Sequence, residues 1–153
     1  PYRTESAIML VQRNDSIKFK DAKSLKDLST IKSFKLAINR GNWYGDIFEK
    51  LKKEKIFKKI LTETTKEVQL YKMLKKGKVT GILVDKFSGY SFLKKLNYNQ
   101  SIVPHPMKVY SDNIFVMFSK KSVKKSFVDR FNLNLKKIKD NGEYKKIIDH
   151  YKN

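Results

Sequence analysis

The chain has 153 residues, a length that suits one domain or two small lobes. Apolar side chains make up 40% of it and aromatic side chains 12%, which is enough for a packed core and excludes an intrinsically disordered chain. There is no cysteine, which excludes disulfides and thiolate metal sites, and no apolar run approaches the roughly 18 residues that a membrane helix needs.

The net charge is +20, from 35 basic and 15 acidic residues, and such a charge raises the question of nucleic-acid binding. Nearly all the basic residues are lysines, and they are spread along the whole chain. Specific recognition of guanine and phosphate favours the planar fork of arginine. We therefore expect a solvated lysine surface with no specific nucleic-acid partner. A basic nucleic-acid binder stays as the weakest alternative, and it predicts a steep salt dependence of binding.

Short apolar runs alternate with segments of helical periodicity through the first two thirds of the chain. The strands predicted there lie at residues 6–13, 34–39, 60–62, 79–84 and 101–103, with a polar loop at 14–23. The helices predicted between them are a short turn after Ser24 and longer helices at 44–55, 64–77 and 87–96. Strand and helix in alternation predict parallel strands joined by right-handed crossovers, with helices on both faces of the sheet.

Two helix starts carry the signature of a capping box, in which Ser or Thr is followed three residues later by an acid. These are Ser24 with Asp27, and Thr64 with Glu67. In the predicted helix at 44–55, Ile47, Phe48 and Leu51 share one face.

The last third of the chain begins with two prolines, Pro104 and Pro106, which predict an extended segment. A strand at 113–118 and a long amphipathic helix at 122–139 follow. Gly142 ends that helix, and a final helix is predicted at 143–151.

Ligands of such sheets bind at the carboxyl ends of the strands, which here are residues 39–43 and 85–88. After the first of these ends, Gly41 allows close approach of the backbone, and a helix start there would offer free N–H groups to an anion such as a carboxylate. Arg40 could add a bidentate contact, and Trp43 or Tyr44 an apolar wall. An ordinary strand-to-helix turn is the alternative interpretation.

The second strand end delivers the carboxylate of Asp85, which could accept hydrogen bonds from an ammonium group. The alternative is that Asp85 caps the helix that begins near Phe87. Catalytic patterns are weak: His105 and His150 have no ligand spacing, and no nucleophile elbow or phosphate loop occurs. We expect no enzymatic activity, no metal and no cofactor.

Taken in order, these segments resemble the extracellular solute-binding proteins of polar amino-acid ABC transporters (family 3, type II periplasmic binding proteins). The matching pieces are Pro1-Tyr2 with the strand that follows, Ser24-Leu25-x-Asp27-Leu28, the strand that ends in Gly41, Leu74-x2-Gly77-Lys78-Val79-x5-Asp85, and Asp140-Asn141-Gly142-Glu143-Tyr144. No single motif is specific, whereas their order and spacing cover nearly the whole chain.

The resemblance implies an α/β fold: a periplasmic-binding-protein-like II lobe with a mainly parallel sheet, helices on both faces and C-terminal helices. It implies an inter-lobe crossing strand at 1–13, the second lobe at 14–105, a return crossing at 106–118, and a tail at 119–153 that belongs to the first lobe. Most of the first lobe, and a signal peptide, would precede Pro1.

By the same resemblance, Asp85 would hold the amino group of a small polar solute, an amino acid, and the amides of Gly41, Asn42 and Trp43 would hold its carboxylate or side chain. An ABC permease would be the membrane partner, in a periplasmic or extracellular location, with an anchor expected through the N-terminus. Where the family has Ser or Thr, this chain has Asn42 and Trp43, which puts the identity of the solute in doubt.

The same lobes also serve as sensor domains of receptors and as modules of cell-wall lytic enzymes, and this remains the main alternative function. We expect apolar surface on the tail helices, which would favour self-association or a partner.

Overall fold

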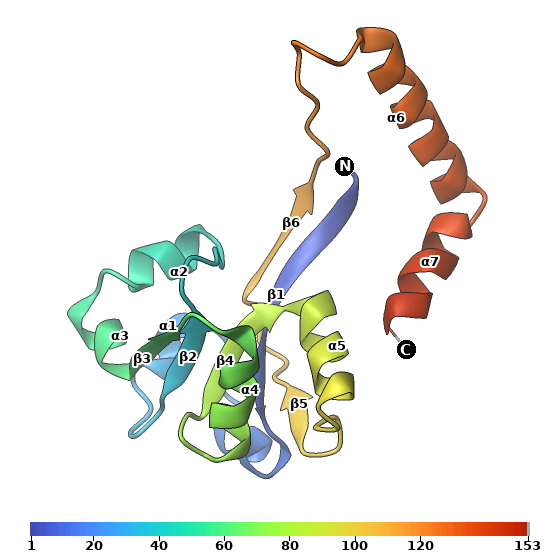
Figure 1. Ribbon diagram of the computed structural model, residues 1–153. Coiled ribbons are helices and arrows are strands. Elements are labelled where there is room, and N and C mark those ends of the chain that lie inside the picture. Colours follow the sequence, from blue (N-terminus) through green and yellow to red (C-terminus); the bar gives the residue numbers. More distant parts are fainter. Residues whose placement is uncertain (153) are drawn as a thin grey trace. The chain divides into compact units, whose positions relative to one another are not determined.

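The computed structural model describes residues 1–152. It divides into two compact units, drawn in Figure 1. The larger unit is Glu5–Asp112, and the smaller one joins Pro1–Thr4 to Asn113–Asn153.

One sheet organises the larger unit, with the strands in the order β3-β2-β4-β1-β5 and β6 paired to β1. The strands are β1 (Arg3–Gln12), β2 (Leu36–Asn39), β3 (Leu61–Thr64), β4 (Gly81–Asp85), β5 (Ile102–Pro104) and β6 (Tyr110–Ile114). The strand β2 is parallel to β3 and to β4, whereas β1 is antiparallel to β4 and to β5.

The predicted fold class is confirmed, with a sheet that is mixed where the sequence predicted a mainly parallel one. The crossover rule applies to β2, β3 and β4, which are joined through helices. It does not apply to β1, whose neighbours β4 and β5 lie far along the chain and run opposite to it.

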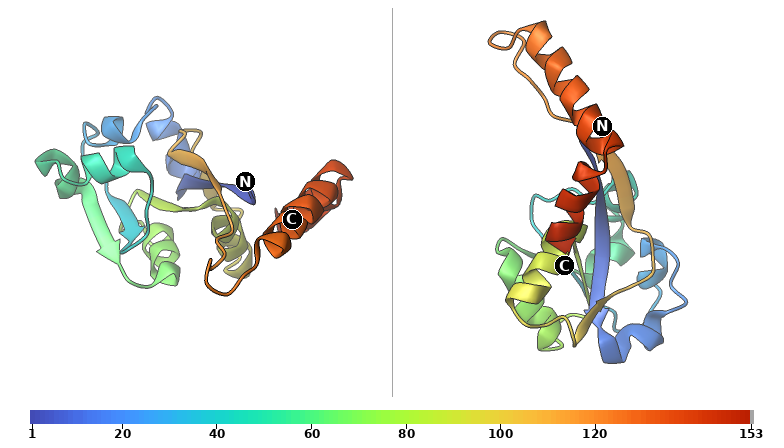
Figure 2. Two further views of the ribbon diagram at one scale, coloured as in Figure 1. Left: turned by 90° about the horizontal axis from the view of Figure 1, so that it is seen from above. Right: turned by 90° about the vertical axis from the view of Figure 1, so that its right-hand side faces the viewer.

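Helices and turns cover both faces of this sheet, as Figures 1 and 2 show. They are η1 (Arg13–Phe19), α1 (Leu25–Leu28), α2 (Asp46–Leu51), α3 (Lys55–Ile60), α4 (Glu67–Lys75) and α5 (Lys86–Lys95). Side chains of α1, α2 and α3 form one apolar cluster, and side chains of α4 and α5 form another. The segment at 14–23, predicted as a polar loop, includes the 3-10 turn η1.

Successive side chains of each central strand enter the two clusters in turn. On β1, Met9 and Val11 enter the first cluster and Leu10 the second. On β4, Leu83 enters the first, and Ile82 and Val84 the second. A strand buried on both faces needs apolar residues at every position, and this explains its continuous apolar sequence.

The helix predicted at 44–55 is two short helices, α2 and α3, with a turn between them. The break lets Phe57 join Phe48 in the core, with ring centroids 6.0 Å apart. In one continuous helix these two residues would lie about half a turn apart, on opposite faces. Ile47, predicted to share the face of Phe48 and Leu51, is instead 66% exposed.

One of the two predicted capping boxes is confirmed. Ser24 accepts a hydrogen bond from Asp27 N, and the Asp27 carboxylate accepts from Ser24 N. The prediction for Thr64 is wrong, because Thr64 is the last residue of β3 and α4 begins at Glu67 after Lys66. The N-cap residue directly precedes the first helical residue, and in α4 that residue is Lys66. Thr64 lies three positions before the helix and belongs to the strand.

The smaller unit contains α6 (Lys125–Asp140) and α7 (Glu143–Lys152), separated at Gly142, as predicted. The ring of Phe118 packs edge-on against Phe127 and Phe131, with centroids 5.8 and 5.2 Å apart. The strand predicted at 113–118 lies earlier, at Tyr110–Ile114. At its end, Ile114 O accepts a backbone hydrogen bond from Tyr2 N at 2.7 Å.

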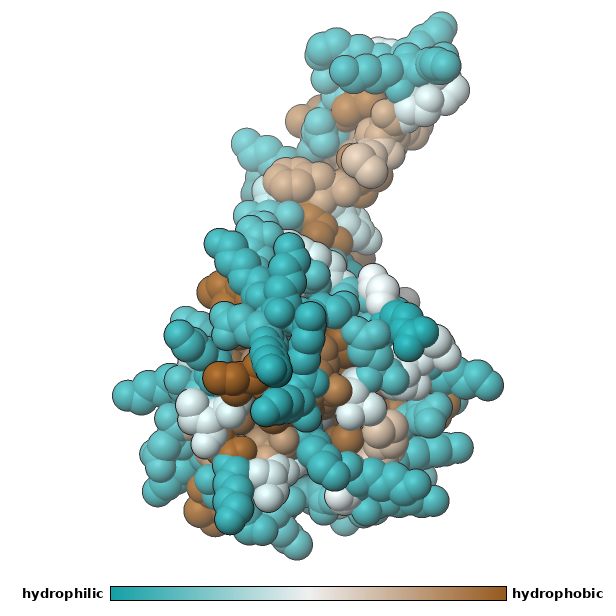
Figure 3. Space-filling model, turned by 90° about the vertical axis from the view of Figure 1, so that its left-hand side faces the viewer, coloured by the Kyte–Doolittle hydropathy of each residue, from teal (hydrophilic) through white to brown (hydrophobic). Residues whose placement is uncertain are grey.

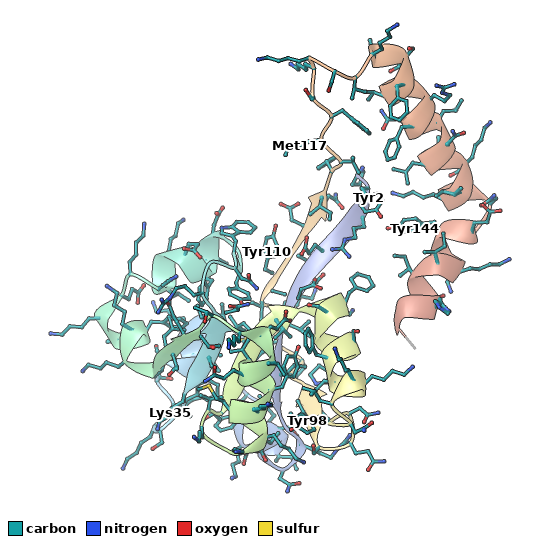
Figure 4. All side chains as sticks on the ribbon, viewed as in Figure 1. Tyr2, Lys35, Tyr98, Tyr110, Met117 and Tyr144 are labelled. Atoms are coloured by element: carbon teal, nitrogen blue, oxygen red, sulfur yellow. The ribbon has the colours of Figure 1, made fainter. Side chains whose placement is uncertain are left out.

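Apolar side chains are exposed on this smaller unit, as expected. Met117 is 93% exposed, and Figure 4 shows it directed away from α6. The other exposed large apolar residues of the unit are Tyr2, Phe115, Val116, Phe127, Leu133 and Ile147. In Figure 3 the apolar colours gather on this unit, whereas the visible face of the larger unit is mostly hydrophilic. No helix in the described part of the chain is long and apolar enough to cross a membrane.

Candidate functional site

The carboxyl ends of β2 and β4 lie at the same edge of the sheet. The two strands are parallel, with Leu36 opposite Gly81 and Ala37 opposite Ile82. Gly41 follows the end of β2 and Asp85 ends β4, so the register brings both predicted site segments to one edge. On the other side of β4, Asp85 is opposite Ala7 of β1.

Asp85 caps helix α5. Its Oδ1 accepts hydrogen bonds from Phe87 N at 3.1 Å and from Ser88 N at 2.9 Å. The capping interpretation is therefore confirmed, and it uses one carboxylate oxygen. The other oxygen, Oδ2, is buried and has no hydrogen-bond partner among the described residues. Burying a carboxylate oxygen without a hydrogen-bond donor costs free energy. Asp85 Oδ2 is therefore a candidate acceptor for a hydrogen bond from a ligand.

Arg40, a predicted anion contact, is engaged within the fold. Its Nε lies 3.1 Å from Glu63 Oε2, and Lys52 Nζ lies 3.2 Å from Glu63 Oε1. These two cations, Lys52 first, hold the pKa of the Glu63 carboxyl below its usual value. A ligand carboxylate would have to compete with Glu63 for the Arg40 guanidinium.

The loop after β2 leaves two amides open. Asn42 N donates to Asn39 O at 3.3 Å, whereas the N–H groups of Gly41 and Trp43 have no partner in the described part of the chain. Gly41 has a φ of +86°, in the region that favours glycine. The helix α2 begins only at Asp46, and its first turn carries Asp46 and Glu49. The open donors are thus loop amides and not helix N-terminal ones.

Trp43 stands over this loop with 52% of its surface exposed. Its ring packs edge-on against Tyr110 of β6, with centroids 4.7 Å apart and planes at 77°. Figure 4 labels Tyr110 on β6, beside the loop that leads into α2. No sequence pattern predicts this pairing, because the two aromatic residues come from distant segments.

A third group of side chains at this edge was not predicted as a site. Glu67 lies in the first turn of α4, and burial together with the charge of Asp85 raises the pKa of Glu67. Tyr71 lies one turn further along α4 and is fully buried, and its ring stacks on Phe92 with centroids 5.3 Å apart. Its hydroxyl, like Asp85 Oδ2, is buried without a partner among the described residues.

No family model and no curated protein matches the sequence. Solved structures do match. One is a putative binding component of an ABC transporter from Wolinella succinogenes, complexed with lysine. Its TM-score is 0.72 at 20% identity, and the match covers 98% of this chain and 60% of that one. The chain has the periplasmic-binding-protein-like II fold.

Two further structures with this fold agree. The second substrate-binding domain of GlnP from Lactococcus lactis has a TM-score of 0.69 at 24% identity, and covers 99% of this chain and 60% of that one. An amino acid ABC transporter substrate-binding protein from Streptococcus pneumoniae, bound to L-arginine, has a TM-score of 0.67 at 21% identity, and covers 99% and 58%. The chain therefore spans about three fifths of the length of these binding proteins.

His105 has a structural role in this periplasmic-binding-protein-like II lobe. It is buried, its Nδ1 accepts from Met107 N at 3.1 Å, and its Nε2 lies 2.8 Å from Phe19 O. Since Nδ1 accepts, Nε2 carries the proton and donates to the carbonyl. In the described part of the chain, no three His, Cys, Asp or Glu residues gather as metal ligands would.

Gly45 gives a stability prediction for the lobe. Its φ is +96° and ψ is 160°, a region that only glycine occupies readily, and a Cβ there would lie 2.7 Å from the Tyr110 ring. We expect Gly45→Ala to lower the free energy of unfolding by about 3 kcal/mol, as strain and overpacking combine. Gly41→Ala is the matched control, because a Cβ at Gly41 meets nothing within 4 Å and adds only the backbone strain, about 1 kcal/mol. Urea unfolding measures both variants. If Gly45→Ala and Gly41→Ala lose the same free energy of unfolding, the close packing of Gly45 on Tyr110 is contradicted.

Glu67 gives a pH prediction. A carboxyl whose pKa is raised in the folded state binds protons more tightly there than in the unfolded chain. The charged form therefore costs stability, and this cost appears as the pH rises through the unfolded pKa and is complete above the folded one. We expect Glu67→Gln to be more stable than the wild type at pH 7 and equal to it near pH 4, by urea midpoints at both pH values. A midpoint difference that does not change with pH would contradict the prediction.

Proposed function

We propose that this chain is part of the substrate-binding component of an ABC transporter and captures a small polar solute, an amino acid. The carrying observation is the convergence at one sheet edge of Asp85 and the open amides of Gly41 and Trp43. An amino acid presents an ammonium and a carboxylate, and this edge offers an acceptor for the first and donors for the second. Solved structures with this fold include an amino acid ABC transporter substrate-binding protein bound to L-arginine and an ABC transporter binding component complexed with lysine, which supports the proposal.

In this proposal Asp85 holds the amino group, and the amides of Gly41 and Trp43 hold the carboxylate. Asn42 N already donates to Asn39 O, so we assign its side chain, and not its amide, to the ligand. Arg40 would contribute charge near the carboxylate while it stays paired with Glu63. The proposed role is binding without chemistry.

The related chains are longer, and a ligand cleft would need the missing share of their length. We propose that a first lobe completes the cleft in the full-length protein and that closure is sensed by a permease in the membrane. The corresponding location is periplasmic or extracellular.

Titration of the full-length protein with each proteinogenic amino acid, followed by calorimetry, tests the proposal. We expect saturable binding of at least one amino acid with a dissociation constant in the micromolar range or below, about −8 kcal/mol. Binding of none of them would overturn the proposed function.

A further inference from the structure

Residues 68–111 have a one-sided charge distribution. They contain eight lysines and a single acid, Asp85. Asp85 lies at the carboxyl end of β4, in the candidate site. At the amino end of β4, therefore, this segment supplies no acid to balance its lysines.

The path of the chain brings the basic ends of two helices to that amino end. The helix α4 ends shortly before β4 begins, and α5 begins directly after β4 ends, so both run antiparallel to β4 (Figure 1). Both pack on one face of the sheet, in the same apolar cluster. Their last turns, which carry Lys72 and Lys75 in α4 and Lys95 in α5, thus lie at the edge opposite the candidate site.

Contacts between the segments hold this end of the larger unit together. Lys75 Nζ donates to Ser101 Oγ at 2.8 Å and lies 5.5 Å from the centre of the Tyr98 ring, which joins the end of α4 to the segment after α5. Lys35 comes from the start of β2, and its carbonyl accepts a hydrogen bond from Thr80 N, next to β4. Figure 4 labels Lys35 and Tyr98 at this same end.

We use the name basic end for six exposed lysines of these segments: Lys35, Lys72, Lys75, Lys76, Lys78 and Lys95. The ion pairs of the described part of the chain involve none of them. The adjoining segment 13–23 does not neutralise them, because it has four basic residues and two acids, and one of these acids, Asp15, pairs with Lys18. Cations stabilise helix C-termini, but Lys35 and Lys78 lie outside helices.

A hollow of about 300 Å³ lies along α4 within the basic end. No acid lines it, and its lining includes four lysines and two apolar side chains: Lys66, Lys72, Lys76, Lys78, Val68 and Met73. Ammonium groups form strong hydrogen bonds with phosphate oxygens. Four of them beside apolar side chains suit a phosphate that is attached to hydrocarbon, as in the headgroup of a lipid.

Lysines in this arrangement favour a flat anionic surface over a nucleic acid. They lack the planar fork that reads guanine and phosphate, and single strands also need exposed aromatic rings on which bases stack. Tyr98, an aromatic residue of this end, is half-buried and covered by Lys75. An anionic bilayer requires charge alone, and each lysine close to it raises the affinity about fivefold.

We propose that the basic end docks the larger unit on an anionic lipid bilayer, with a headgroup phosphate in the hollow along α4. The inference goes beyond the proposed function and takes from it only a location outside the cytoplasm. The candidate site lies at the opposite edge of the sheet, so the bilayer does not cover it. The net charge of +20 attracts the same surface at longer range.

Sedimentation of the full-length protein with lipid vesicles tests the inference. At about 0.15 M salt we expect binding to vesicles that contain phosphatidylglycerol and none to vesicles of phosphatidylcholine alone. At about 1 M salt the screening length falls from about 8 Å to about 3 Å, and the binding should be lost.

Two double variants separate the basic end from the net charge. Lys72→Gln with Lys95→Gln removes one charge from the last turn of each helix, and it should lower vesicle binding about 25-fold. Lys50→Gln with Lys53→Gln is the matched control, because it removes the same charge from exposed lysines of α2 and the turn after it, on the other face of the sheet. The control should lower vesicle binding less than about threefold. Circular dichroism checks that both variants are folded.

Four outcomes would overturn the inference. The first is equal binding to neutral and anionic vesicles, and the second is an equal loss in the two double variants, since net charge alone would then decide. The third is tighter binding to duplex DNA than to vesicles at the same salt, which would make the basic end a nucleic-acid site. The fourth is release from the vesicles by millimolar inorganic phosphate, which would assign the hollow to a free anion.

Calorimetry with amino acids on the same proteins keeps the two proposals apart. Both double variants should bind amino acids as the wild type does, because neither changes the candidate site. Failure to bind anionic vesicles would leave the proposed function standing. Failure to bind any amino acid, with vesicle binding intact, would overturn the proposed function and leave the docking surface in place.

Discussion

Replacing Asp85 by asparagine should abolish amino-acid binding by the full-length protein while the fold stays intact. Asparagine is as good an N-cap as aspartate, so its Oδ1 can still accept from Phe87 N and Ser88 N. Its amide NH₂ group would take the place of the buried Oδ2, and such a group donates hydrogen bonds and does not accept them. That exchange replaces a charged acceptor by a donor that repels an ammonium group. We expect affinity to fall about 100-fold or more.

Two comparisons make this result specific. Asp85→Ala removes the cap as well, and it should cost about 1 kcal/mol of stability in addition to the binding. Asp15→Asn removes an equal charge from the distant η1 turn and should leave the dissociation constant unchanged. If Asp85→Asn binds amino acids as the wild type does, Asp85 is a cap only and is not a ligand contact.

Replacing Phe48 by alanine should destabilise the lobe by about 3–5 kcal/mol. Phe48 is fully buried in α2, between the rings of Tyr44 and Phe57, with centroids 5.2 and 6.0 Å away. Its removal leaves a cavity that three elements border, so the surrounding side chains cannot all relax into it. A loss of this size is a large part of the stability of a small domain.

Ile47 is the matched control for Phe48, because it is the preceding residue of the same helix and is 66% exposed. Ile47→Ala should change the free energy of unfolding by less than about 0.5 kcal/mol. Urea unfolding followed by circular dichroism measures both variants. Similar losses at the two positions would mean that α2 packs as the sequence predicted, with Ile47 inward.

The helices and strands that could be predicted are those whose bounds depend on neighbouring residues in the sequence and not on distant contacts. The apolar run of β4 and the reciprocal caps of Ser24 and Asp27 are local signals, and the structure confirms both. The split between α2 and α3 could not be predicted, because it depends on Phe57 reaching the core beside Phe48. The bounds of β6 depend likewise on its pairing with β1, which comes from a distant part of the chain.

The candidate site divides in the same way. The ends of β2 and β4 could be predicted to share an edge, because a parallel crossover dictates it. Tyr110 could not, because it reaches that edge through the antiparallel register of β1, which no local pattern reports. The sequence predicted Glu67 only as part of a capping box. Its proximity to Asp85 could not be predicted, because it follows from the packing of α4 and α5 on the same face of the sheet.

The close approach of Gly45 to Tyr110 has an evolutionary consequence. A side chain at the first position and a full ring at the second cannot occupy the same space at 2.7 Å. Among relatives of this protein, the two positions should therefore vary together, with a larger residue at one accompanied by a smaller residue at the other. Such covariation would link the loop that carries Trp43 to β6 through the history of the sequence alone.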